Sequence, residues 1–267
     1  MVLNIVHFIH FTGPNSRPFG LVNYLAVKAA NDVQKPAYIF MYCNREPVNN
    51  PYWEKMRRLD RVVTIAMDAP EDYRGVSLQG YPQYQADVVR IQRLKKMGGI
   101  YLDTDAIVLK PLNDLFANQC AMSAVTLEDG SLSFGNSTIV AQKESKFINA
   151  WLDRMDEGLK SGVWAWHGAN LPGLIAKEMP EEITVLDQSA FMPFHFNDDS
   201  YVSKSAPKDV EECLAKCKDS YVVHLWETFR PNDIANITED YVANADTALA
   251  VILRGVMNGD KSTVTGP

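Results

Sequence analysis

A chain of 267 residues, of which 46% are hydrophobic and 10% aromatic, can bury one substantial core, so disorder is not expected. The formal net charge of −7 argues against a protein that binds nucleic acid through a basic face, and it disfavours anionic membranes for the same reason. The apolar runs all fall short of the roughly 20 residues that span a bilayer, so no transmembrane segment is expected. The four scattered cysteines indicate reduced thiols, and we expect a soluble cytoplasmic protein.

Short apolar runs alternate with longer amphipathic segments along the chain, which is the pattern of an α/β layer architecture. The first run contains two histidines and lacks a basic leader, so it predicts a buried strand at Leu3–Ile9 rather than a signal peptide. A turn is predicted at Gly13–Ser16. The next predicted elements are, in chain order, a helix at Phe19–Asn31, a strand at Ala37–Tyr42, a short helix at Pro51–Arg58, a strand at Val62–Met67 and a long loop at Asp68–Pro82.

The helix predicted at Tyr84–Met97 has a broad apolar side, and the pair Gly98-Gly99 ends it before a short strand at Ile100–Leu102. Residues 1–258 are expected to form one domain, followed by a flexible tail over residues 259–267. The remaining predicted elements are strands near Ala121–Thr126, Ser137–Ala141, Thr184–Leu186 and Tyr221–His224, and helices near Lys143–Glu157, Ala169–Glu178, Asp209–Lys218 and Tyr241–Met257.

Two acidic residues, Asp103 and Asp105, stand where the strand at Ile100–Leu102 ends. Ligands bind at the carboxyl ends of strands in α/β sheets, and residues i and i+2 of an extended segment point the same way. Two converging carboxylates repel each other unless a cation lies between them, and Mg²⁺ or Mn²⁺ suits such oxygen ligands. A D-x-D tripeptide alone is better explained by an exposed acidic turn. The helix, glycine pair and strand that precede this one favour a metal site.

The whole segment Ala86–Leu112 closely resembles the DXD sugar-binding region of glycosyltransferase family 32, which includes α-mannosyltransferases and α-1,4-galactosyl- and N-acetylglucosaminyltransferases. The same block recurs in the glucosylating bacterial toxins. The resemblance implies a GT-A fold, which is a Rossmann-type α/β/α sandwich with a mixed, mainly parallel sheet. It also implies retaining transfer of a hexose or hexosamine from a UDP- or GDP-sugar to an acceptor hydroxyl of a glycan or polysaccharide, with Mn²⁺ or Mg²⁺ as cofactor.

Looser matches extend the resemblance over most of the chain. Val6–Gly13 is similar to the family's first strand and nucleotide loop, Phe134–Ala141 to its asparagine-containing strand, and Val222–Trp226 to its histidine-tryptophan element. By analogy, Asp105 ligates the metal directly, and Asp103 contacts the ribose or sugar, or the metal through water. The implied catalytic residues are Asp87, Arg90, Asp103 and Asp105; the implied metal ligands are Asp103, Asp105 and His224; and the implied donor contacts are His10, Phe11, Thr12, Gly13, Tyr101, Thr104, Asn136 and Trp226.

Several of these residues also have a purely structural interpretation. Asp87 and Arg90 are three apart on the predicted helix, so a surface ion pair of small energetic effect is the alternative to the favoured role in binding the donor sugar. The loop His167–Gly173 is weakly similar to the family's Gly-Pro loop near the acceptor. Trp164 and Trp166 beside it are predicted to fill core rather than to stack on a sugar.

The main rival is a phosphatase of the haloacid-dehalogenase type with Asp103 as its nucleophile. Its first motif is also a strand followed by Asp-x-Asp. That motif normally opens the fold, whereas here about a third of the chain precedes it. A further alternative is an inactive or purely carbohydrate-binding module. The sequence leaves open the donor sugar and base, the acceptor and linkage, and the oligomeric state.

Overall fold

The computed structural model describes residues 1–13 and 16–260. Its centre is an 8-stranded sheet that is mixed and mainly parallel, as predicted. The antiparallel pairs on its main path are β6–β10 and β8–β10. The strands across the sheet are β11 (Thr184–Leu186), β8 (Cys120–Thr126), β10 (Thr138–Ala141), β6 (Gly99–Leu102), β1 (Ile5–His10), β2 (Tyr38–Cys43) and β3 (Val62–Ala66), with β9 (Leu132–Phe134) paired to β8.

Both faces of the sheet are buried, which explains why its strands are apolar at almost every position. In β1, Val6 and Phe8 belong to one apolar cluster, whereas Ile9 belongs to the other. In β6, Ile100 and Tyr101 divide in the same way. Successive side chains of a strand point to opposite faces, so each strand supplies both clusters.

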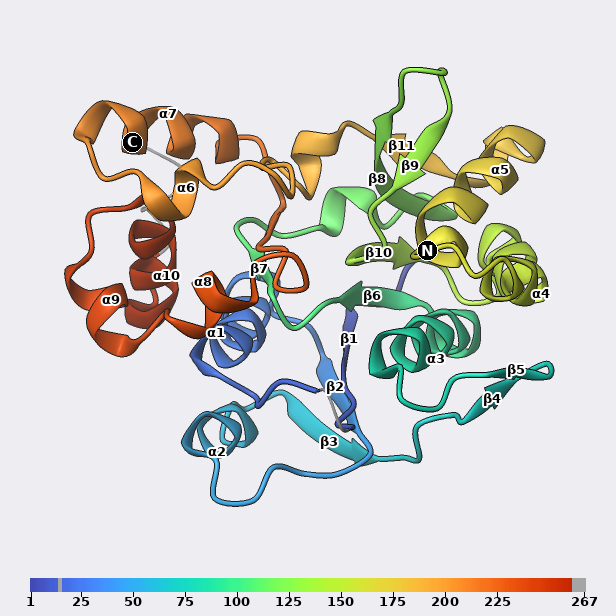
Figure 1. Ribbon diagram of the computed structural model, residues 1–267, viewed down its shortest axis with the longest axis horizontal. Coiled ribbons are helices and arrows are strands. Elements are labelled where there is room, and N and C mark those ends of the chain that lie inside the picture. Colours follow the sequence, from blue (N-terminus) through green and yellow to red (C-terminus); the bar gives the residue numbers. More distant parts are fainter. Residues whose placement is uncertain (14–15, 261–267) are drawn as a thin grey trace.

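Helices cover both faces of the sheet and complete the predicted α/β/α sandwich (Figure 1). One face is covered by α1 (Leu21–Ala29), which continues as the π-helix η1 (Ala30–Gln34), and by α2 (Pro51–Arg57). The other face is covered by α3 (Pro82–Met97), α4 (Lys146–Lys160) and α5 (Leu171–Glu178). The C-terminal helices pack in the same cluster as α1 and are α6 (Ser200–Ser203), α7 (Pro207–Cys217), α8 (Pro231–Ala235), α9 (Glu239–Asn244) and α10 (Ala248–Asn258).

Short elements connect these layers. The strands β7 (Ala106–Val108) and β12 (Val222–His224) form a separate antiparallel pair, and β4 (Asp72–Tyr73) and β5 (Val76–Ser77) form a small hairpin. The single helical turns are η2 (Asn113–Leu115), η3 (Trp166–Asn170), η4 (Pro180–Glu182) and η5 (Gln188–Ala190).

The predicted elements are present, with two corrections. The single helix predicted at Tyr241–Met257 is wrong, because α9 ends and α10 begins afresh after Thr247, whose Oγ1 accepts a hydrogen bond from the Ala250 backbone N–H (3.2 Å). The loop predicted at Asp68–Pro82 contains the β4–β5 hairpin. Residues 14–15 of the predicted turn and residues 261–267 of the predicted tail lie outside the described residues.

The glycine pair after α3 places β6 close against its neighbours. Gly98 has φ 66° and Gly99 has φ 105°, both in the region that favours glycine. A Cβ on Gly98 would lie 2.5 Å from the backbone N of Lys143, and one on Gly99 would lie 2.6 Å from Cγ1 of Ile5. A side chain at Gly99 would therefore push β6 away from β1, and one at Gly98 would push against the backbone that follows β10.

Two expectations concern the compartment of the protein. Within the described residues, no helix has the length and apolarity that a membrane crossing requires. All four cysteines are buried and unpaired. The cytoplasmic location and the domain boundary at residue 258 stay predictions.

Candidate active site

The acidic pair lies in a tight turn between β6 and β7, and neighbouring elements hold the backbone of that turn. The Asp103 N–H donates to the carbonyl of Ser137 (2.8 Å), which begins the approach to β10. The side-chain amide of Asn23, on α1, donates to the carbonyl of Thr104 (3.0 Å). The backbone of the turn is thus fixed by a neighbouring strand of the sheet and by a helix that covers one face of it.

A histidine joins the two carboxylates. His224 ends β12, where it is paired with Ala106 of β7, so the strand pair carries the imidazole to the acidic turn. Its Nε2 lies 3.3 Å from Oδ1 of Asp105 and 3.9 Å from Oδ2 of Asp103. One ligand atom from each of the three residues falls within 4.8 Å of the others. Two carboxylate oxygens and one imidazole nitrogen are a donor set that fits Mn²⁺ or a similar divalent cation.

The pKa values of Asp103, Asp105 and His224 are shifted by burial and by the charges of neighbouring groups. Burial raises the pKa of Asp103, and the charge of Asp105 adds to that increase while Arg90 opposes it. Burial acts on Asp105 in the same direction, but the charge and hydrogen bond of His224 prevail and lower the pKa of Asp105. Burial alone would lower the pKa of His224, and the neighbouring carboxylates raise it instead.

Arg90 of α3 connects the acidic turn to a third carboxylate, that of Asp87. One guanidinium nitrogen lies 3.0 Å from Asp87 and 3.2 Å from Asp103, and the other donates to the carbonyl of Asn136 (2.7 Å). The guanidinium also lies over the ring of Tyr101, 4.3 Å from its centroid. Arg90 is only 5% exposed and Asp87 8%, so a surface ion pair is not what these two residues form. The Tyr101 hydroxyl donates to Asp103 as well (2.6 Å).

Asp87 is held by residues that are far from it in the sequence. Nε2 of His167 lies 2.8 Å from one Asp87 oxygen, and the side-chain amide of Asn136 donates to the other (2.9 Å). Burial works against the charged form, but Arg90 and His167 together lower the pKa of Asp87. His167 and Gly168 belong to η3, and a Cβ on Gly168 would lie 2.5 Å from the Asn136 amide nitrogen. In sequence, this loop is only weakly similar to the family's loop near the acceptor, and nothing in its spacing pointed to Asp87.

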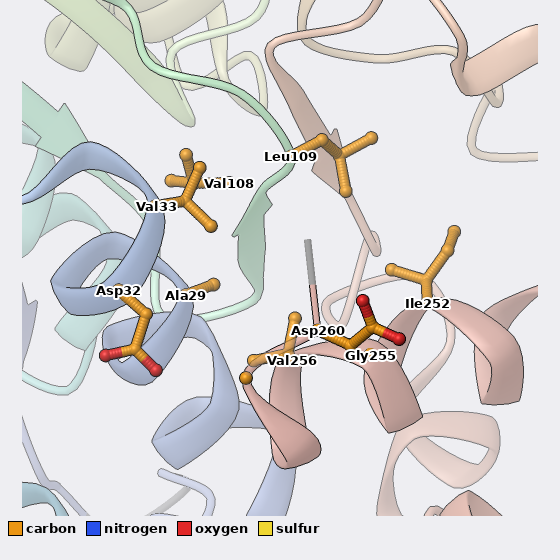
Figure 2. Close-up of a pocket in the computed structure, with 10 residues that line it drawn as sticks. Ala29, Asp32, Val33, Val108, Leu109, Ile252, Gly255, Val256 and Asp260 are labelled. Atoms are coloured by element: carbon orange, nitrogen blue, oxygen red, sulfur yellow. The ribbon is translucent and has the colours of Figure 1, made fainter. Parts of the chain in front are cut away.

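The acidic turn faces a cavity of about 440 Å³, which is within the usual range for small-molecule sites. The predicted residues Asp87, Arg90, Tyr101, Asp103, Thr104, Asp105, Asn136, His224 and Trp226 all line it. Figure 2 shows a second cavity, between α1, β7 and α10, which is lined mainly by apolar side chains such as Val33, Leu109 and Ile252. Its volume of about 40 Å³ holds little more than one water molecule, so it is too small for a sugar nucleotide.

The four residues predicted for the nucleotide loop divide into two groups. His10 and Phe11 line the large cavity, but their rings are mostly buried. The ring of His10 packs against Phe19 (5.3 Å between centroids), and burial lowers the pKa of His10 to about 4. Thr12 and Gly13 are not among the lining residues; Thr12 is held by Asn44 through its backbone N–H and carbonyl (both 2.8 Å). Nucleotide contacts by these four residues stay a prediction.

Two further lining residues, Glu227 and Arg17, were missed by the sequence analysis. The backbone N–H of Glu227 donates to Oδ2 of Asp105 (2.7 Å), and Arg17 donates to the carbonyl of Glu227 (2.7 Å). Trp226, just before Glu227, has φ 58° and an indole that donates to the carbonyl of Phe194 (2.8 Å). A non-glycine residue held in this strained conformation fits a segment whose shape serves the site.

The tryptophans beside η3 do not behave alike. Trp166 packs partly buried against the cluster around α3 and α4, as predicted. Trp164 is 51% exposed and lines the cavity, so the prediction that it fills core is wrong. The chain turns at Ala165, which has φ 56°, and this turn directs the Trp164 ring out of the core.

Two family models match the chain. The glycosyltransferase sugar-binding region containing DXD motif matches residues 33–122, and the alpha 1,4-glycosyltransferase conserved region matches residues 140–245. The first match includes Asp87, Arg90 and the acidic pair, and the second includes His167 and His224. Both family models describe regions of glycosyltransferases, and the chain is similar to them over these two segments.

Named relatives agree with this class. Glucan organizing enzyme 1 of Cryptococcus neoformans var. grubii is 26% identical over 266 residues, which are 95% of this chain and 70% of that protein. Lactosylceramide 4-alpha-galactosyltransferase of Pongo pygmaeus is 28% identical over 153 residues, and that of Homo sapiens is 27% identical over the same number. The matched part is 53% of this chain and only 66% and 40% of those two enzymes.

A solved structure confirms the fold. The glycosyltransferase GlyE of Streptococcus pneumoniae TIGR4 is similar to this chain with a TM-score of 0.53 at 12% identity, over 99% of this chain and 62% of that one. The GT-A-like fold predicted from the sequence is therefore present. The two family models and the named relatives, not this structure, show that the protein is an enzyme of the glycosyltransferase class. None of these matches supports the phosphatase alternative.

Proposed function

We propose that this protein is a metal-dependent, retaining glycosyltransferase that moves a hexose or hexosamine from a UDP- or GDP-sugar to a hydroxyl group of a glycan. The observation that carries this proposal is the convergence of Asp103, Asp105 and His224 at the wall of a cavity of about 440 Å³. A divalent cation held by these three residues would supply Lewis-acid stabilisation of the diphosphate leaving group, where negative charge builds up.

Residues that line the cavity hold Asp103 in position and are proposed to orient the donor sugar. Arg90 and Tyr101 hold Asp103 in place by contacts of 3.2 Å and 2.6 Å. Asp87 and Asn136 present hydrogen-bonding groups to the same cavity, where the hydroxyls of the donor sugar are proposed to bind. Both are already tied to buried partners, so they are ordered before substrate arrives, and the entropy lost on binding is correspondingly small.

Retention is supported by the family resemblance, and the contacts of the cavity's carboxylates favour a retaining route without an enzymic nucleophile. Asp87 is bonded to Arg90, His167 and Asn136, and Asp105 is bonded to the Glu227 backbone, so neither is a free nucleophile. We therefore favour reaction on one face of the sugar. The bond between the anomeric carbon and the diphosphate oxygen breaks, the acceptor oxygen bonds to the anomeric carbon from the same side, and the acceptor proton passes to the departing diphosphate.

The decisive experiment measures the release of nucleoside diphosphate from a panel of UDP- and GDP-sugars, with Mn²⁺ and with EDTA. We expect hydrolysis of one donor in Mn²⁺ and its loss in EDTA. Asp105→Asn should lower the rate by about two orders of magnitude or more, because metal-assisted stabilisation contributes several kcal/mol and about 1.4 kcal/mol corresponds to tenfold. Asp60→Asn, an exposed aspartate in a turn, is the matched control and should keep full activity. Full activity of Asp105→Asn, or activity that persists in EDTA, would overturn the proposal.

A further inference from the structure

Three aromatic rings contact one another beside the cavity. Tyr81 stacks on Tyr84 with ring centroids 5.4 Å apart and planes inclined by 19°, and Tyr84 lies 5.5 Å from Trp164. The two tyrosines lie at the beginning of α3, whereas Trp164 lies in the segment between α4 and η3. Tyr84 and Trp164 line the cavity, and Tyr81 extends the row beyond the lining residues. We call these three residues the aromatic row.

The two outer rings of the aromatic row are exposed, and Tyr84 between them is partly buried. Tyr81 is 55% exposed and Trp164 51%, whereas the tryptophans Trp53 and Trp151 are fully buried. The backbone of the segment that presents Trp164 is strained at the next residue. Ala165 adopts φ 56°, which costs an L-residue roughly 1–2 kcal/mol, and its carbonyl accepts hydrogen bonds from residues 168 and 169. Strain kept to hold an apolar ring in solvent indicates a binding surface rather than poor packing.

The aromatic row is connected to the reaction centre. The ring of Tyr84 meets the imidazole of His167 edge-on, with centroids 4.7 Å apart, and His167 bonds to Asp87. Tyr84 also precedes Asp87 by three residues on α3, so both side chains lie on the same side of that helix. A ligand that packs on Tyr84 and Trp164 is therefore a neighbour of the group bound at Asp87.

We propose that the aromatic row is the subsite for the acceptor, and that the acceptor is a glycan whose pyranose rings pack on it. This inference rests on the proposed function. A pyranose has an apolar face that suits an aromatic ring and hydroxyls that need neutral hydrogen-bonding partners, which Gln83 and Ser133 of the same cavity provide. The row itself carries no charged side chain, so it is not built for a phosphate or an acidic ligand.

The rival occupant is the base of the nucleotide sugar, because Gly13 of the predicted nucleotide loop approaches Pro82, next to Tyr81. The two occupants are separated by comparing transfer with hydrolysis. Hydrolysis into water needs only the donor, whereas transfer needs both substrates. The probes are the nucleotide sugar that the wild-type protein hydrolyses and, as acceptors, methyl glycosides, lactose, maltose and cellobiose.

Trp164→Ala should lower the ratio of transfer to hydrolysis about tenfold through a higher KM for the acceptor, and Trp164→Phe should restore most of it. Tyr81→Ala should reduce transfer to the disaccharides more than transfer to the methyl glycosides, because Tyr81 lies farther from the reaction centre. Tyr38→Ala, an aromatic residue that is 54% exposed at the start of β2 and outside the cavity, is the control and should change neither rate.

Three results overturn the inference. If Trp164→Ala raises the KM of the nucleotide sugar and slows hydrolysis as much as transfer, the row binds the donor base. If Trp164→Ala and Tyr81→Ala both leave the ratio unchanged, the row binds neither substrate. If the wild-type protein releases no nucleoside diphosphate from any donor, the proposed function itself fails, and the proposed subsite fails with it. This third result is distinct from the first two, because both of those require a wild-type protein that is active.

Discussion

Replacing Arg90 by methionine removes a charge from between two carboxylates while keeping most of the side chain's length. Arg90 and Asp87 are almost fully buried and 3.0 Å apart. Removal of one partner from a buried ion pair typically costs 3–5 kcal/mol, because the other charge stays buried without compensation. Asp87 keeps its contacts with His167 and Asn136, so we expect the lower end, a loss of about 3 kcal/mol in the free energy of unfolding. Arg90→Lys should lose less, since it keeps the charge but not the planar fork.

The assay is urea unfolding of protein free of metal and nucleotide, with Arg74→Met as the control. Arg74 pairs with Asp153 and Asp156 on the surface and is 47% exposed, so its loss should cost at most about 1 kcal/mol. The double variant with Asp87→Asn removes the stranded charge, so its loss in the free energy of unfolding should be smaller than the sum of the two single losses by about 1 kcal/mol or more. If Arg90→Met is no less stable than Arg74→Met, the buried pair does not hold α3 to the site.

Two further changes test the supports of the site. Gly99→Ala places a Cβ 2.6 Å from Ile5 and should lower the free energy of unfolding by more than about 2 kcal/mol. Gly75→Ala is the control, because Gly75 has positive φ but open space around it, and this variant should lose about 1 kcal/mol. Equal losses for the two variants in urea unfolding would show that β6 can move to accommodate the added methyl group. His167→Ala should raise the KM of the nucleotide sugar about tenfold by freeing Asp87, and His167→Gln, which keeps a donor, should raise it less than about threefold. Identical KM values for the two His167 variants would mean that the bond to Asp87 does not orient the donor.

Short sequence patterns predicted the part of the site whose residues are close together along the chain. The helix, the glycine pair, the strand and the acidic turn follow one another within the segment Ala86–Leu112, so periodicity and conformational preference were sufficient to place Asp103 and Asp105 at a strand end. The alternating strands and amphipathic helices predicted an α/β layer architecture for the same reason, and the family resemblance implied the α/β/α sandwich. Where the local signal was weak, as around Thr247, the predicted helix was wrong because a polar cap and not hydrophobicity decides the boundary.

The partners of those residues were decided by the tertiary structure. His167 meets Asp87 and Trp164 meets Tyr84 at separations of about 80 residues along the chain, and the Glu227 backbone reaches Asp105 across more than 120. Such contacts depend on how η3 and the segment after β12 pack against the sheet, and no spacing in the sequence encodes that. The chain by itself therefore determines which chemical groups are available. The packing of its layers determines which are buried, which stay exposed and which bond to one another.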